Sequence, residues 1–218
     1  MTPRCQSSPR PLLRAWALLM LVLVTASLLV AICTPLLAAA LDPPRECAVL
    51  RSTLTREARV RFGLDAPVPL LTGMIYQESS CNPSARNRYD GGAGLGQLTG
   101  QANIDWITDR GGFGAPDVFN PAWNLRASFW LLDWGNRQLQ AVDECQRYGA
   151  GLFVYNAGIK YGLQAQRKSR EPGVWFGATE LIDTTQSEEN WRYSHDYPRR
   201  IIYRHQPRFS AWGRTVCF

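Results

Sequence analysis

Residues 67–100 read PVPLLTGMIYQESSCNPSARNRYDGGAGLGQLTG and carry the clearest structural signal in the chain. Spacings of three and four residues place one set of side chains on a single helical face: Leu71, Met74, Ile75 and Glu78. Pro83 disfavours helical backbone in the residue before it, so we predict that this helix spans 67–80. Glu78 therefore lies near the end of a helix, on a face that is otherwise apolar.

A carboxyl group on an apolar face is costly to ionise, so its pKa is expected to be raised. A carboxyl that stays protonated near neutral pH suits a general acid, such as one that protonates a glycosidic oxygen as its bond breaks. A simpler interpretation is a glutamate at a helix end that reaches water. The helical periodicity does not decide between these two interpretations of Glu78.

The first 40 of the 218 residues differ in kind from the rest. Three arginines and no acidic residue precede the almost entirely apolar run 15–34, and a row of three alanines ends at Ala40. A run of about 20 apolar residues can span a bilayer as a helix. We predict an export segment over 1–40, cleaved after about Ala40, with an uncleaved inner-membrane anchor through 15–34 as the alternative. In both cases 41–218 forms one periplasmic domain.

The net charge of the chain after residue 40 indicates what kind of partner it can bind. Without the three arginines of the export segment, the net charge falls from +6 to +3. A modest positive surplus fits a mildly anionic polymer such as the cell wall. It does not predict nucleic-acid binding, which needs a concentrated basic patch.

Four cysteines lie outside the export segment: Cys47, Cys81, Cys145 and Cys217. An even number in an exported domain predicts two disulfides, and the sequence does not choose among the three pairings. No CxxC pair occurs, and His195 and His205 have no suitably spaced partners, so we expect neither a metal nor another cofactor.

The remaining pattern predicts a mainly α-helical single domain without convincing strands. Helices are expected at 45–63, 67–80, 94–109, 121–142, 144–157 and 188–205. We expect 171–187 to be mostly irregular and Pro198 to kink or restart the last helix. The longest helix carries an apolar stripe that is expected to be core: Trp123, Ala127, Trp130, Leu131 and Trp134.

Five short motifs resemble those of the soluble lytic transglycosylases, whose lysozyme-like catalytic fold is shared with goose-type lysozymes. They are Glu78-Ser79 before Asn82-Pro83, Gly94-Leu95-Gly96-Gln97-Leu98, FNPAWNL at 119–125, Val154-Tyr155-Asn156-Ala157-Gly158, and Tyr197 with Ile201. Each string is weak alone. Five in the right order across 45–204 form a strong signal, which implies a lysozyme-like helical domain.

The resemblance implies a reaction with one catalytic carboxyl. Glu78 would protonate the oxygen between MurNAc and GlcNAc in peptidoglycan, then take a proton from the MurNAc 6-hydroxyl, giving a 1,6-anhydro sugar. Substrate-binding roles are implied for Ser79, Gln97, Tyr155, Asn156 and Tyr197. An acetamido group of the substrate can stabilise the developing cation, so the second carboxylate of other glycosidases is not required.

Some positions depart from the family or allow two roles. Gly96 replaces a usual methionine, which predicts a wider or looser groove wall. Asp90 would make the protein a muramidase if it activated water, but an Asp-Gly turn bonded to its own backbone is the preferred interpretation. Asn124 either ties loop backbone to a helix start or, as preferred, caps the first helical turn.

The expected partner is the peptidoglycan glycan strand. A non-catalytic wall-binding subunit of a secretion, conjugation or phage machine is the competing class of protein. The presence of Glu78 and Gln97 argues against it, because a binding module needs no buried acid. Wall remodelling, a secretion or conjugation apparatus and phage lysis all remain open as settings.

Overall fold

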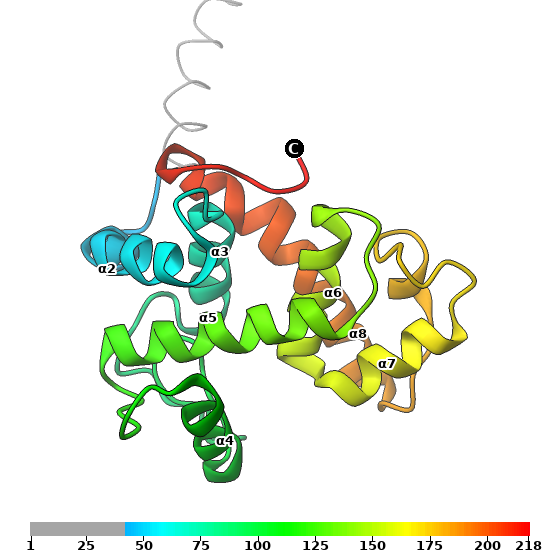
Figure 1. Ribbon diagram of the computed structural model, residues 1–218, viewed down its shortest axis with the longest axis horizontal. Coiled ribbons are helices and arrows are strands. Elements are labelled where there is room, and N and C mark those ends of the chain that lie inside the picture. The colour runs from blue at the N-terminus through cyan, green and yellow to red at the C-terminus, as the bar shows by residue number, and fades with distance from the viewer. Residues whose placement is uncertain (1–41) are drawn as a thin grey trace, which may run out of the picture. The chain divides into compact units, whose positions relative to one another are not determined.

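The computed structural model describes residues 42–218, which fold into helices joined by loops, the longest of them at 80–100 and 169–187 (Figure 1). The α-helices are α2 (Arg45–Phe62), α3 (Val68–Ser79), α4 (Gln101–Gly111), α5 (Pro121–Gln138), α6 (Glu144–Ala157), α7 (Ile159–Lys168) and α8 (Glu188–Arg199). Other helical turns are the 3₁₀ helix η1 (Thr179–Leu181), the π-helix η2 (Arg200–His205) and the 3₁₀ helix η3 (Gln206–Trp212). Two isolated bridges are the only β-pairing in this part of the chain. The expected mainly α-helical fold is confirmed.

Helix α3 is the most deeply buried element. Every residue from Val68 to Ile75 is buried, because α2, η2 and η3 all pack against this helix. The prediction of one apolar face was therefore too narrow. Only the last turn, from Tyr76 to Ser79, is partly exposed, and this turn carries Glu78.

Helix α5 crosses the domain and contacts α2, α4 and α6 (Figure 1). Its tryptophans pack on α4: Trp123, Ala127 and Trp130 form a cluster with Ile104 and Ile107. Leu131 and Trp134 are partly buried and pack against this cluster, so the predicted stripe faces the core.

The predicted helix over 94–109 is wrong in its first half. The backbone has positive φ at Gly94 (75°), Gln97 (49°) and Gly100 (72°), a conformation that a right-handed helix cannot contain. Ala93 instead forms a bridge with Leu98, and α4 begins only at Gln101.

Helix α6 has the predicted bounds, and Gly158 ends it with a φ of 91°. Helix α7, which follows at once, was not predicted. Its buried residues are Gly162, Ala165 and Gln166, none of which has a large apolar side chain. The segment 171–187 is irregular apart from the single turn η1, as expected.

The last predicted helix, 188–205, is divided. Helix α8 ends at Arg199, and the chain continues as η2. Pro198 has no backbone N–H for the helical ladder, which accounts for the interruption that the sequence predicted.

Two disulfides are present, as predicted, and their pairing is now defined. Cys47–Cys81 joins the first turn of α2 to the end of α3, and Cys145–Cys217 joins α6 to the C-terminal segment. Such bonds are compatible with export to an oxidising compartment.

The predicted export segment or anchor over 1–40 lies outside the described residues. Between residues 42 and 218, no helix is both long enough and apolar enough to cross a bilayer.

Candidate active site

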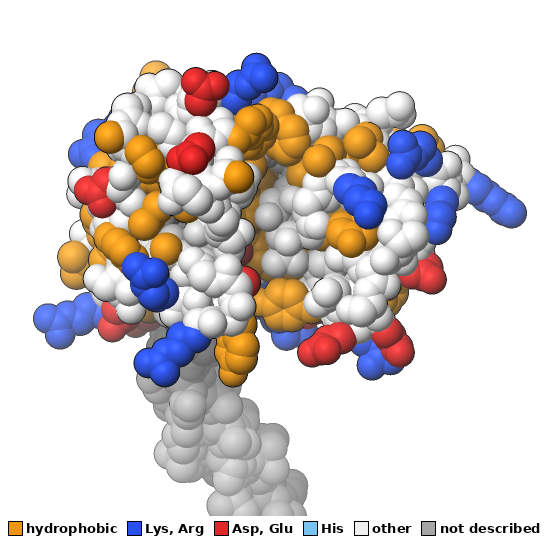
Figure 2. Space-filling model, turned by 90° about the horizontal axis from the view of Figure 1, so that it is seen from below, with side chains coloured by type: hydrophobic (Ala, Val, Ile, Leu, Met, Phe, Trp, Pro, Cys, Tyr) orange, Lys and Arg blue, Asp and Glu red, His pale blue; other side chains and the backbone are white. Residues whose placement is uncertain are grey.

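Glu78 lies half-buried in the last turn of α3, on the wall of a cavity of about 330 Å³. The cavity is lined by Gln77, Glu78, Asn87, Asp90, Gln97, Thr99, Tyr155, Asn156 and Tyr193. All of these side chains are polar, so the cavity offers amide, hydroxyl and carboxyl groups to a ligand. One face of the domain is visibly hollowed between two lobes, with acidic surface on the wall of the hollow (Figure 2).

Tyr197 holds the Glu78 carboxyl from within the domain. It is 1% exposed, and its hydroxyl donates a hydrogen bond to Glu78 Oε1. Burial and the neighbouring Glu78 hold the pKa of Tyr197 well above its usual range, so this phenol remains a donor. One carboxyl oxygen is thus occupied and the other, Oε2, is left for a ligand.

The environment of Glu78 makes its carboxyl a weaker acid than that of an exposed glutamate. Burial raises the pKa of Glu78 from 4.5 to about 7, against the opposing effect of the Tyr197 hydrogen bond. The charge of Asp90 adds to the increase, and the charge of Arg200 reduces it. A proton is therefore held on this carboxyl near neutral pH, which is the property predicted for a general acid.

Asp90 lies on the same cavity but is engaged in its own loop. Its Oδ1 accepts a hydrogen bond of 2.9 Å from the backbone N–H of Gly92, which is the predicted Asp-Gly turn. Gln97, on the same loop, donates from Nε2 to the Gly94 carbonyl at 2.8 Å. The loop therefore presents both side chains at the cavity while its backbone is fixed locally.

Asn124 fixes this loop to α5. It is fully buried, accepts a 2.7 Å hydrogen bond from Gly96 N–H, and donates to the carbonyls of Ala93 and Val118. The preferred prediction of a first-turn cap was wrong, because Asn120 is the N-cap of α5. The alternative, a side chain that ties loop backbone to the helix, is what the structure contains.

Gly96 does not widen the cavity wall. A Cβ atom at Gly96 would lie 1.9 Å from Ser128 Oγ and 2.7 Å from the Tyr155 hydroxyl. The Tyr155 hydroxyl also donates to the Gly96 carbonyl at 2.6 Å. The prediction of a looser wall was wrong, because Ser128 and Tyr155 fill the space beside this glycine.

Most of the residues that were predicted to bind substrate line the cavity, but not all of them do. Gln97, Tyr155 and Asn156 line it with Glu78. Ser79 is not among the lining residues, and its hydroxyl donates to the Ile75 carbonyl of its own helix at 3.2 Å.

Four lining residues were not anticipated: Gln77, Asn87, Thr99 and Tyr193. Gln77 is fixed by His205, whose Nε2 lies 2.8 Å from Gln77 Oε1. Tyr193 could have been found from its spacing, since it precedes Tyr197 by one helical turn.

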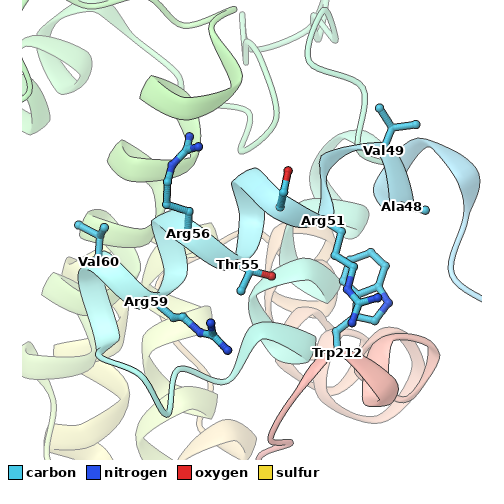
Figure 3. Close-up of a pocket in the computed structure, with 9 residues that line it drawn as sticks. Ala48, Val49, Arg51, Thr55, Arg56, Arg59, Val60 and Trp212 are labelled. Carbon is cyan, nitrogen blue, oxygen red and sulfur yellow. The ribbon is translucent and has the colours of Figure 1, made fainter.

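A larger hollow of about 870 Å³ lies along the outer face of α2 and shares no residue with the Glu78 cavity (Figure 3). Its lining includes Arg51, Arg56, Arg59 and Trp212 but no carboxyl group, so it offers no acid. Residues 42–218 also contain no group of three or more acidic, cysteine or histidine side chains placed to bind a metal ion.

A protein-family model matches most of the part of the chain that forms this site. The family model described as the transglycosylase SLT domain matches residues 54–175, which is more than half of the chain and includes Glu78, Gln97 and Tyr155. The match ends before α8, so Tyr193 and Tyr197 lie beyond it. No curated protein matches the chain. By its sequence over 54–175, the chain belongs to the transglycosylase SLT domain family, as the motif resemblance had indicated.

Proposed function

We propose that this protein cleaves the β-1,4 bond between MurNAc and GlcNAc in peptidoglycan with Glu78 as its single catalytic residue. Membership of the SLT family indicates lytic transglycosylase activity on peptidoglycan. The observation that carries the finer proposal is one carboxyl with a pKa of about 7 on a polar cavity. Hydroxyl, amide and carboxyl groups on the cavity wall suit the hydroxyl and acetamido groups of a glycan.

The first step uses the proton on Glu78. The bond between MurNAc C1 and the glycosidic oxygen breaks, and that oxygen leaves with the Glu78 proton. The substrate's own acetamido group stabilises the positive charge that develops at C1. The Tyr197 hydrogen bond occupies Oε1, so Oε2 is the oxygen from which we expect the proton to be transferred.

The second step returns the carboxyl to its starting state. Ionised Glu78 takes the proton of the MurNAc 6-hydroxyl, and that oxygen forms a bond to C1. The product is 1,6-anhydroMurNAc, and no water is consumed. Gln97, Tyr155 and Asn156 are proposed to bind the sugars, because they line the cavity around the acid.

The muramidase alternative rests on Asp90, which lies on the same cavity and raises the pKa of Glu78 by its charge. A water activated by Asp90 would add to C1 and give an ordinary reducing end. The engagement of Asp90 with Gly92 N–H favours the transglycosylase. The periplasm is the proposed location, after cleavage near Ala40 or with 15–34 as an anchor.

Product masses from purified peptidoglycan test the proposal. We expect the full-length protein to release anhydro products, which are lighter by one water than reducing products. Glu78→Gln should slow release about 1,000-fold, whereas the control Glu171→Gln, an exposed loop residue, should retain the rate.

Three results would each reject a part of this proposal. Reducing ends without anhydro sugar, abolished in Asp90→Asn, would identify a muramidase. Undiminished wall lysis by Glu78→Gln would show that Glu78 is not the acid, and a wild-type protein that binds the wall without cleaving it would be a binding subunit.

A further inference from the structure

One aromatic ring at the edge of the Glu78 cavity has no part in the proposed chemistry. Tyr193 is 52% exposed and lines both this cavity and a second hollow of about 490 Å³. The second hollow is formed with Glu188, Glu189, Arg192 and Asp196. Tyr193 is the one residue that the linings of these two hollows share.

The position of this ring relative to the acid follows from α8. Tyr193 and Tyr197 are four residues apart, so they lie on the same face of the helix, about 6 Å apart along its axis. Tyr197 is buried and bonded to Glu78, while Tyr193 is one turn away on the same cavity. A ligand chain that passes Glu78 along α8 next meets the Tyr193 ring.

Arg200 holds the ring in place. Its guanidinium carbon lies 4.6 Å from the centre of the Tyr193 ring, and Nη2 donates to the Tyr193 carbonyl at 3.4 Å. Arg200 is in turn paired with Asp196 at 3.2 Å. One face of the ring is thus covered by a cation, and a ring fixed in advance loses little conformational entropy when a ligand binds.

We infer that Tyr193 is a sugar-stacking platform, which extends glycan binding from the Glu78 cavity into the neighbouring hollow. A pyranose has one face made largely of C–H groups, which are weakly positive and apolar. Such a face packs on the negative face of an aromatic ring. This subsite rests on the proposed function, since its ligand is the same β-1,4-linked glycan of 2-acetamido sugars.

Binding without turnover tests the platform apart from the reaction. The protein is Glu78→Gln, and the probe is a β-1,4-linked GlcNAc hexasaccharide, titrated by calorimetry. We expect the Kd to rise about fivefold to tenfold when Tyr193→Ala is added, and to change little with Tyr193→Phe, which keeps the ring.

The matched control is Tyr203→Ala. Tyr203 is 41% exposed, but it packs on Phe176 and Phe218 and does not line the Glu78 cavity. Thermal unfolding of each variant checks that the domain remains folded. An unchanged Kd in Tyr193→Ala, or no hexasaccharide binding with Tyr193 intact, would overturn the inference.

Kinetics with soluble peptidoglycan strands separate this inference from the proposed function. With Glu78 present, Tyr193→Ala should raise KM about fivefold to tenfold while kcat stays within about threefold. A wild-type protein that binds the sugar but forms no anhydro product would contradict the proposed function alone. Normal wild-type turnover with an unchanged KM in Tyr193→Ala would contradict the platform alone.

Discussion

The Tyr197 hydroxyl donates a hydrogen bond to Glu78 although the two residues are 119 positions apart in the sequence. The contact exists because η2 and η3, which continue the chain after α8, both pack on α3. This packing brings the helix that carries Tyr197 against the end of the helix that carries Glu78. The orientation of the proposed acid therefore depends on a part of the chain beyond the family match at 54–175.

Tyr197→Phe should move the pH dependence of activity upward. The hydroxyl lowers the pKa of Glu78, so its loss should raise that pKa above about 7. A general acid is active while protonated, so the alkaline limb of kcat/KM should shift to higher pH. We expect kcat itself to fall about tenfold, because the carboxyl loses the hydrogen bond that orients it.

The measurement is kcat/KM for formation of the anhydro product, at a series of pH values between 5 and 9. Tyr203→Phe removes a hydroxyl that does not contact Glu78 and serves as the control. An alkaline limb that stays in place or moves downward in Tyr197→Phe would contradict the prediction.

Glu78→Gln should make the protein more stable above pH 7. The pKa of Glu78 is about 7 in the folded protein against an ordinary value of 4.5, so the folded state binds the proton more tightly. Stability from this group is fully present below pH 4.5 and is lost as pH rises through about 7. Glutamine stays neutral, so the variant should gain about 3 kcal/mol over wild type at pH 8.

Denaturant unfolding of the full-length protein at pH 5 and pH 8 measures this difference. The advantage of Glu78→Gln should be larger at pH 8, and Glu171→Gln, which changes an exposed loop residue, is measured beside it as the control. An advantage that is equal at both pH values, or larger at pH 5, would show that Glu78 does not titrate as described.

Helices could be predicted from the sequence where the local pattern of residues determines the backbone conformation. Helix α6 has apolar periodicity and the glycine that ends it, and both of its bounds were predicted. The loop 94–100 was predicted to begin a helix, and that prediction is wrong. Its conformation depends instead on a distant contact: a Cβ atom at Gly94 would lie 2.0 Å from the Val118 carbonyl, and no local pattern reveals this.

The same distinction applies to the site. The position of Glu78 on an otherwise apolar helix face could be predicted, because it follows from the spacing of a few neighbouring residues. The role of Asn124 depends on carbonyls and an N–H that other segments supply, so a cap was the simpler local prediction. Tyr193 belongs to no motif quoted for the family, although its spacing of one helical turn from Tyr197 could have indicated that it lies on the same cavity as Glu78.

The two disulfides should contribute similarly to stability but differently to activity. They close chain separations of 34 and 72 residues, for which loop entropy predicts about 4 kcal/mol each. Cys81 lies three residues after Glu78, so removing Cys47–Cys81 frees the end of the helix that carries Glu78. We expect Cys47→Ala with Cys81→Ala to lower kcat at a temperature at which the variant remains folded.

The matched control is Cys145→Ala with Cys217→Ala, which removes the bond to the C-terminal segment. Unfolding curves and anhydro-product kinetics are measured for both pairs. Equal kcat values in the two double variants would show that the Cys47–Cys81 bond has no special role in positioning Glu78.

Gly96 and Ser128 should behave as a coupled pair. A methyl group at Gly96 would meet Ser128 Oγ at 1.9 Å, so Gly96→Ala alone should cost about 1–3 kcal/mol of stability and displace the loop that carries Gln97. Ser128→Ala removes that oxygen and should reduce the cost of Gly96→Ala. Relief should be incomplete, because the Tyr155 hydroxyl would still lie 2.7 Å from the new methyl group. A double-mutant cycle by denaturant unfolding measures the coupling, and strictly additive losses would show that Ser128 does not occupy the space beside Gly96.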